Sequence, residues 1–201
     1  MLTLRGSSSS PFVRKVMIAI DLLGLADAIR FERADTMDPK DSVREQNPLG
    51  KIPVLILEDR SPLYDSRVIL EWLDDRAGGG MIIPRKHALR FEALRLQAIG
   101  DGIMDAGVLQ VYEGRWRPKE RHEPKWVEHQ AGKIACALTF LDGQTLTLRP
   151  MIHVGHIAVA SALGYLDFRF EGRWRPGHPR LVEWLDEFAA KVPAFAQTKP
   201  Q

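Results

Sequence analysis

Residues 47–57 read Asn47-Pro48-Leu49-Gly50-Lys51-Ile52-Pro53-Val54-Leu55-Ile56-Leu57, with a proline directly before an apolar run. The run from Val54 to Leu57 is typical of a short buried strand, and Asp59-Arg60 predicts a turn into a partner strand at Leu63-Tyr64. Proline lowers the cost of a cis peptide bond to about 0.5–1 kcal/mol. The Ile52-Pro53 bond at the start of this strand is therefore suited to the cis form.

Strand and helix patterns alternate on both sides of this stretch, as in an α/β unit. A serine N-cap followed by proline at the first helical position predicts a helix that starts at Ser10-Pro11. Gly24 is suited to end that helix. The other elements predicted here are strands at Leu2–Leu4 and around Ile29 and Phe31, and a helix that opens at Asp65-Ser66.

A glycine-rich segment from Ala77 to Lys86 is the best linker candidate, and only helical patterns follow it. These patterns predict helices from about Ala88 toward Glu113, over Val127 to Leu141, over Ile157 to Leu166 and from Pro179 onward. The third of them is apolar on nearly every face, which is typical of a helix buried within a bundle. We therefore expect an α/β domain over residues 1–78, a linker over 79–87 and an all-α helical-bundle domain over 88–201.

Composition and charge narrow the class of protein. The chain has 201 residues, 45% of them hydrophobic, with 28 basic and 26 acidic side chains, which excludes intrinsic disorder. No apolar run reaches the roughly 18 residues of a membrane span, and no basic stripe indicates nucleic-acid binding. The single cysteine, Cys136, excludes an internal disulfide, and we expect it to be a small buried hydrophobe. A cytoplasmic protein is expected, with neither a membrane nor a nucleic acid as partner.

Four patches of the sequence match a known pattern together. They are residues 47–55 followed by Asp65-Ser66, Ser10 to Lys15, Asp101 to Ala106, and Ala162 to Arg169. These patches resemble the glutathione transferases, in particular a bacterial subgroup, with serine at the catalytic position. The resemblance implies a thioredoxin-like N-terminal domain that binds glutathione and an all-helical C-terminal domain that holds the second substrate. It also implies a homodimer that uses glutathione as co-substrate, and we expect no metal.

The resemblance assigns roles within the N-terminal domain. It implies that the backbone of Ile52 pairs with the cysteinyl part of glutathione, that Ser66 seats the γ-glutamyl carboxylate, and that Asp65 lies near its ammonium group. Lys51 is assigned to the glycyl carboxylate, although a lysine in a loop is usually just solvated. The residues expected to bind glutathione are Ser9, Ser10, Phe12, Lys51, Ile52, Pro53, Asp65 and Ser66.

Ser10 is the residue expected to act in catalysis, with Ser9 as its substitute. A free thiol has a pKa of about 8.5, and the thiolate is the nucleophile. A hydroxyl donor aimed at the sulfur, together with the positive end of the helix begun at Pro11, favours the thiolate. The alternative is that Ser10 only caps the helix, a role worth about 1 kcal/mol.

Gly-Arg-Trp-Arg-Pro occurs twice, at Gly114 to Pro118 and at Gly172 to Pro176. Tryptophan between arginines more often covers a surface than binds a ligand. In the resembled fold, however, the first copy follows a long helix near the second-substrate pocket. We therefore expect Tyr112 and Trp116 to line the pocket of an apolar electrophile, and Arg115 to be the partner of an anionic substrate.

His153 and His156 have a spacing that suits metal ligands on one helical face, but two ligands without an obvious third indicate a metal only weakly. The resembled family commonly has a Ser/Thr-x-x-Asp capping box at this position. A protonated histidine at a helix start opposes the helix dipole. We therefore predict a loss of stability below about pH 6.5, which a His156→Asp substitution restores.

The leading hypothesis is a glutathione transferase that stabilises a bound glutathione thiolate for attack on a small electrophile. One alternative is a glutathione-dependent isomerase, dehalogenase or disulfide reductase that uses the same thiolate. Another is a non-catalytic glutathione-binding or interaction protein that keeps the fold. A mechanism that uses a thiol of the enzyme is disfavoured, because Ser10 stands where such a cysteine is needed.

Overall fold

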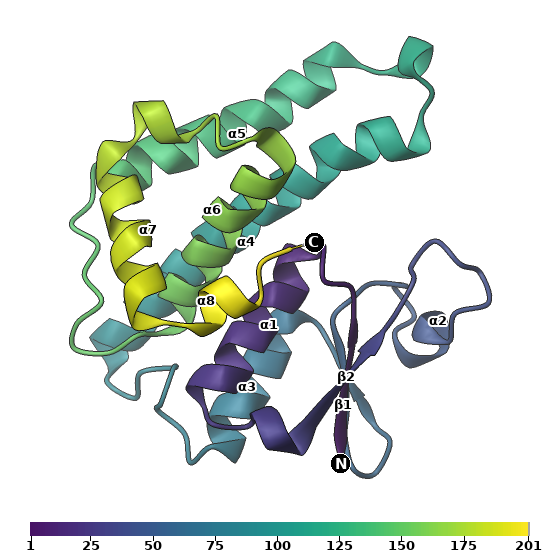
Figure 1. The fold of residues 1–201 in the computed structure, drawn as a ribbon, viewed down its shortest axis with the longest axis vertical. Coiled ribbons are helices and arrows are strands. Elements are labelled where there is room, and N and C mark those ends of the chain that lie inside the picture. Colours follow the sequence, from purple (N-terminus) through teal and green to yellow (C-terminus); the bar gives the residue numbers. More distant parts are fainter. Residues whose placement is uncertain (201) are drawn as a thin grey trace.

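Four strands form a mixed sheet in the computed structural model, which describes residues 1–200. Helices α1 (Pro11–Leu22) and α3 (Ser66–Arg76) lie between this sheet and the helical region, and the short α2 (Val43–Gln46) lies on the other side (Figure 1). This is the predicted thioredoxin-like arrangement. The strand order is β2-β1-β3-β4, in which β1 (Leu2–Gly6) is parallel to β2 (Ile29–Arg33) and antiparallel to β3 (Val54–Ile56), which is antiparallel to β4 (Pro62–Leu63).

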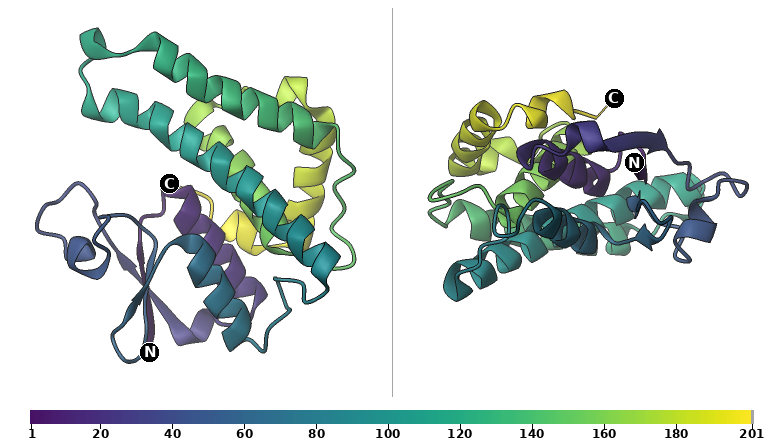
Figure 2. Two further views of the ribbon diagram at one scale, coloured as in Figure 1. Left: turned by 180° about the vertical axis from the view of Figure 1, so that it is seen from behind. Right: turned by 90° about the horizontal axis from the view of Figure 1, so that it is seen from below.

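The rest of the chain is helical, as predicted. Helices α4 (His87–Trp116) and α5 (Pro124–Asp142) form a long antiparallel hairpin whose tip extends beyond the sheet (Figure 2). Among residues 1–200, no helix has the length and apolar character needed to cross a bilayer. The remaining elements are α6 (Val154–Phe170), α7 (Pro179–Lys191), α8 (Ala194–Gln197) and single 3-10 turns at Ala26–Ala28, Lys119–Arg121 and Arg175–Gly177.

Helix α6 lies at the centre of the molecule, and every residue from Val154 to Leu166 is buried. Two glycines of α4 allow α4 and α6 to come close. A Cβ on Gly100 would lie 2.6 Å from the Ala158 carbonyl carbon, and one on Gly107 would lie 3.1 Å from the Tyr165 ring. Helix α6 also packs against α1, so the sheet domain and the helical region share one hydrophobic core.

The local signals of the sequence are confirmed around α1 and the third strand. Ser10 is the N-cap of α1, and its Oγ accepts a hydrogen bond from the Val13 N–H at 3.4 Å. Gly24 follows α1 with φ of +67°, a backbone conformation that favours glycine. The Ile52-Pro53 peptide bond is cis.

The expectation that Cys136 is buried is wrong, because its side chain is exposed on α5. The buried face of α5 includes Ile134 and Leu138, which are four residues apart. Cys136 lies midway between them in sequence, so the helical repeat of about 3.6 residues turns it to the opposite side. The helical pattern around Cys136 was therefore correct, but it did not show on which face of the helix Cys136 lies.

Candidate functional site

Three segments of the sheet domain meet at one edge of the sheet. Arg5 of β1 lies opposite Val54 of β3, and Leu55 of β3 lies opposite Leu63 of β4. The segments directly after β1, before β3 and after β4 are therefore neighbours. They carry most of the residues predicted to bind glutathione, namely Ser9 and Ser10, Lys51 to Pro53, and Asp65 with Ser66; Phe12 follows in the first turn of α1, half-buried against the core.

Four serines form a tight turn between β1 and α1. The Ser10 N–H donates to the Ser7 carbonyl oxygen at 3.0 Å, and the hydroxyl oxygens of Ser7 and Ser9 lie 3.1 Å apart. The Ser10 hydroxyl accepts from the Val13 N–H, and a hydroxyl that accepts one hydrogen bond keeps its own hydrogen to donate. Ser10 therefore caps α1 and still offers a donor at the positive end of the helix. The Ser9 hydroxyl forms a hydrogen bond with that of Ser7, in which either oxygen can be the donor.

Asn47, which is 2% exposed, holds the loop before β3. Its Nδ2 donates to the Lys51 carbonyl oxygen at 2.9 Å, and its Oδ1 accepts from the Leu49 N–H at 3.0 Å. These bonds fix the backbone directly before the cis Ile52-Pro53 bond, while the Lys51 side chain is exposed. Asn47 is not among the residues predicted for the site, although asparagine in a turn commonly bonds to backbone two residues on.

Asp65 and Ser66 lie at the start of α3. Ser66 is buried, and the first N–H groups of a helix have no acceptor within it, so this end suits an anion. The Asp65 carboxylate forms an ion pair with Arg67 at 2.8 Å. Partial burial acts to raise the pKa of Asp65, but hydrogen bonds from Arg67 outweigh it and hold that pKa below its ordinary value. The sequence analysis did not predict Arg67 at this site. Arg67 competes with the ammonium group of glutathione for the Asp65 carboxylate.

A buried ion pair lies where α1 meets α4. Lys15 Nζ donates to Asp101 Oδ1 at 2.6 Å, and the two residues are 0% and 7% exposed. Burial lowers the pKa of Lys15, and Asp101 acts against that shift. One turn further along α4, loss of solvation and the charge of Asp101 raise the pKa of Asp105, while Lys51 and Arg67 act to lower it. Helix α4 therefore brings two carboxylates to the edge of the candidate site, which the sequence did not predict.

The residues predicted for the second-substrate pocket lie in the last turns of α4. The Arg115 guanidinium lies 5.2 Å from the centre of the Tyr112 ring. Both residues lie within electrostatic range of Tyr165 of α6. Burial raises the pKa of the Tyr165 phenol, and the guanidiniums of Arg169 and Arg115 act to lower it. Trp116 is 61% exposed at the helix end. The fold therefore brings Tyr112 and Arg115 to α6 and leaves Trp116 in solvent.

The two Gly-Arg-Trp-Arg-Pro copies are not equivalent. In the second copy, Trp174 is 7% exposed and its Nε1 donates to Asp167 at 2.9 Å. Arg175 forms an ion pair with the same carboxylate at 2.6 Å. The second copy is therefore a structural element after α6, whereas Trp116 of the first copy makes no comparable buried contact.

His153 and His156 form the N-terminal cap of α6. The His153 N–H donates to Nδ1 of His156 at 3.3 Å, and the two rings stack with their centres 3.6 Å apart. Burial lowers the pKa of His153 to about 4 and that of His156 to about 3. His156 therefore serves near neutral pH as an uncharged acceptor in place of an acidic cap. Within residues 1–200, no third metal-binding side chain joins the pair.

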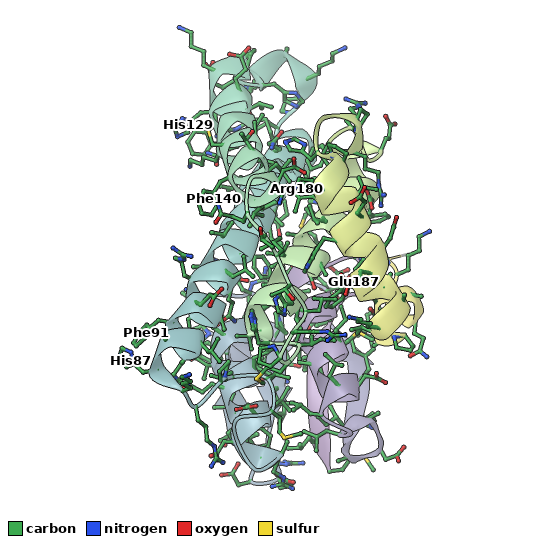
Figure 3. The ribbon with its side chains drawn as sticks, turned by 90° about the vertical axis from the view of Figure 1, so that its left-hand side faces the viewer. His87, Phe91, His129, Phe140, Arg180 and Glu187 are labelled. Atoms are coloured by element: carbon green, nitrogen blue, oxygen red, sulfur yellow. The ribbon has the colours of Figure 1, made fainter. Side chains whose placement is uncertain are left out.

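Two hollows lie away from the sheet edge. The larger, of about 220 Å³, lies between the end of α5, the loop that follows it and α7, and is bordered by Trp184, Arg180 and Glu187 (Figure 3). The smaller, of about 50 Å³, lies beside His153 and His156. Neither is bordered by a residue predicted to bind glutathione.

The chain is similar to known proteins over nearly its whole length. Residues 9–76 match the family described as "Glutathione S-transferase, N-terminal domain". An Escherichia coli K12 protein named "Uncharacterized GST-like protein YibF" is 33% identical over 201 residues, which covers 97% of this chain and 96% of that protein. The chain belongs to the glutathione S-transferase family.

Solved structures of glutathione transferases match the whole fold. A family member from Pseudomonas fluorescens Pf-5 with bound glutathione is 39% identical, covers 100% of both chains and gives a TM-score of 0.93. A second structure from the same strain, with bound S-(propanoic acid)-glutathione, is also 39% identical over 100% of both chains and gives a TM-score of 0.89. The sheet domain and the helical region of this chain thus have the arrangement of a glutathione transferase.

Proposed function

We propose that this chain is a serine-type glutathione transferase in which Ser10 stabilises the thiolate of bound glutathione. The observation that carries the proposal is the state of the Ser10 hydroxyl. It lies at the N-terminus of α1, accepts from the Val13 N–H and keeps its own hydrogen to donate. The helix end adds positive potential at the same place, so both features favour a thiolate over a thiol.

Glutathione fits along the sheet edge in one orientation. Its cysteinyl part pairs with the backbone of Ile52, which Asn47 holds in place, and its γ-glutamyl carboxylate lies at the buried Ser66 at the start of α3. Its ammonium group lies near Asp65, and its glycyl carboxylate near the exposed Lys51. The relatives with bound glutathione and bound S-(propanoic acid)-glutathione support this choice of ligand.

The reaction proposed is nucleophilic substitution or addition by the bound sulfur. The thiol first loses its proton to solvent. With chlorodinitrobenzene, the sulfur then forms a bond to the ring carbon, the carbon–chlorine bond breaks, and chloride leaves with the electron pair. Ser10 donates a hydrogen bond to the sulfur and is not itself the nucleophile. Lowering the thiol pKa by two units, at about 1.4 kcal/mol per unit, makes the thiolate the majority form near neutrality.

Calorimetric titration with glutathione and an assay of chlorodinitrobenzene conjugation test this proposal. We expect saturable binding and a conjugation rate that rises with pH as the bound thiol ionises. Binding without conjugation across a panel of electrophiles would favour a non-catalytic binding protein, and isomerised or reduced products would favour a related glutathione-dependent reaction. No binding at millimolar glutathione would contradict every one of these functions.

The homodimer is also part of the proposal. Phe91 on α4 and Phe140 on α5 are 57% and 44% exposed, and both point away from the body of the chain (Figure 3). Exposed aromatic side chains on one face suit a surface that a second copy covers. Sedimentation equilibrium at micromolar protein measures the mass, and a monomer mass would contradict the dimer.

A further inference from the structure

Arg115 of α4 and Arg169 of α6 extend into the same space. The two helices run parallel, because Gly100 lies against Ala158 and Gly107 lies against Tyr165. Arg169 follows Tyr165 by four residues, and Arg115 follows Gly107 by eight, so each stays on the helix face that meets the other helix. Both guanidiniums act to lower the pKa of the Tyr165 phenol, so both positive charges lie within electrostatic range of that one side chain.

Neither guanidinium is neutralised by the protein. Among residues 1–200, Arg115 and Arg169 form no ion pair. Nε of Arg169 is buried without a protein acceptor, and a buried donor left in that state is unfavourable unless water or a ligand supplies the acceptor. Asp167, two residues earlier on α6, is already bound by Trp174 and Arg175.

The packing of α1 against α6 places Arg169 toward the proposed position of the sulfur. Helices α1 and α6 run in opposite directions, and Arg14 in the first turn of α1 contacts Gly164 (Figure 1). Phe168 follows Gly164 by four residues, so it lies toward the start of α1, where Ser10 is. The Arg169 guanidinium lies 4.2 Å from the centre of the Phe168 ring. A group bonded to the sulfur therefore extends from Ser10 toward Phe168 and Arg169.

We propose that the electrophile carries a carboxylate, which Arg169 and Arg115 bind while Tyr112 and Tyr165 cover the adjoining carbon atoms. Guanidinium groups present N–H donors in a planar fork that matches a carboxylate, and the bound anion supplies the acceptor that Nε of Arg169 lacks. The aromatic rings give the rest of the substrate apolar contacts. This assignment rests on the proposed function, because it defines the substrate of the same glutathione site.

Two glutathione derivatives of matched length test the assignment, S-(carboxypropyl)glutathione and S-butylglutathione. Calorimetry measures the Kd of each, together with that of glutathione itself, for the wild type and for Arg169→Gln, Arg115→Gln and Arg121→Gln. Arg121 is exposed near the tip of the α4–α5 hairpin and is the matched control for a change in net charge. Because Arg115 is exposed, its substitution tests the assignment even if Arg169→Gln fails to fold.

We expect the wild type to bind the carboxypropyl derivative roughly tenfold more tightly than the butyl derivative. Arg169→Gln and Arg115→Gln should each reduce this ratio severalfold, and Arg121→Gln should leave it unchanged. A wild-type ratio near one, or an equal decrease in all three variants, would overturn the carboxylate assignment while leaving glutathione binding intact. No binding of glutathione itself would instead overturn the proposed function and this assignment with it.

Discussion

Lys15 and Asp101, which lie 86 residues apart in the chain, form a buried ion pair with 2.6 Å between Nζ and Oδ1. Lys15 is on α1 of the sheet domain, and Asp101 is on α4 of the helical region. The other carboxylate oxygen, Oδ2 of Asp101, is buried without a partner. The pair therefore joins the two parts of the chain close to the candidate site, and each charge depends on the other for compensation.

Removing one partner of this pair should destabilise the protein strongly. We expect Asp101→Ala to lower the free energy of unfolding by about 3–5 kcal/mol, because it leaves the Lys15 ammonium buried alone. The double variant Lys15→Met/Asp101→Leu should lose less than the sum of the losses in the single variants Lys15→Met and Asp101→Leu. Urea unfolding at neutral pH measures these values, and strict additivity would show that the two charges do not interact.

An exposed ion pair supplies the control for that experiment. Arg76 and Glu58 are paired at 3.0 Å, and both side chains are about half exposed. Glu58→Ala should therefore change the free energy of unfolding by no more than about 1 kcal/mol. A loss as large as that of Asp101→Ala would mean that burial is not what makes the Lys15 pair important.

Acid should destabilise the protein through the histidine cap of α6. His156 has a pKa of about 3 in the fold, against about 6.5 in the unfolded chain. Because the folded pKa of this base is lowered, its contribution to stability is complete above pH 6.5 and is lost as the pH falls toward 3. Between pH 7.5 and 5, we expect a loss of about 2 kcal/mol from this residue.

His156→Asp should reduce this acid sensitivity. A carboxylate keeps an acceptor for the His153 N–H and adds a favourable negative charge at the helix start. Unfolding free energies at pH 7.5 and pH 5 measure the effect, with the exposed His129→Asn as control. The explanation fails if His156→Asp loses as much stability in acid as the wild type.

Asn47→Ala should weaken glutathione binding more than it slows turnover at saturation. The substitution removes both side-chain bonds that hold the backbone at Leu49 and Lys51. We expect the Kd for glutathione to rise about tenfold, because that is the size of effect expected for losing one or two buried hydrogen bonds. The kcat should change by less than about threefold. The control is Glu45→Ala, because Glu45 is exposed on α2, the short helix that ends directly before Asn47. A lower kcat with unchanged Kd would place Asn47 in another role.

Ser10→Ala should reduce kcat by about tenfold to a hundredfold, because a hydrogen bond to a charged sulfur contributes about 1.5–3 kcal/mol. Glutathione Kd should change by less than about threefold. Ser9→Ala is the comparison variant, because Ser9 is the alternative catalytic residue and its hydroxyl forms a hydrogen bond with that of Ser7. If Ser9→Ala loses the activity and Ser10→Ala keeps it, the catalytic role belongs to Ser9.

Local signals predicted the parts of the fold and site that depend on local chemistry. Ser10 before Pro11 predicted the start of α1, and the proline at position 53 predicted a cis bond before the third strand. The order of strand and helix patterns predicted an α/β domain, and the resemblance to the glutathione transferases implied that it is thioredoxin-like. These features could be predicted because a cap, a turn or an X-Pro bond is determined by residues adjacent in sequence.

The contacts that escaped prediction join residues far apart in the chain. A lysine in the first turns of an amphipathic helix indicates solvent exposure, and only Asp101 on a distant helix explains why Lys15 is buried. Arg14 likewise donates to the Phe195 carbonyl oxygen at 2.6 Å, which fastens the unpredicted α8 to α1. The close packing of α4 against α6, with Gly100 at Ala158 and Gly107 at Tyr165, likewise joins segments far apart in sequence.

The pKa of the glutathione thiol bound to this protein tests the role of Ser10 most directly. Thiolate absorbance in the ultraviolet, recorded against pH with glutathione saturating the wild type and Ser10→Ala, measures it. We predict a bound thiol pKa about two units below the free value of about 8.5, and a rise of at least about one unit in Ser10→Ala. A bound thiol that titrates at the free value, or at the same pKa in both proteins, would contradict this role.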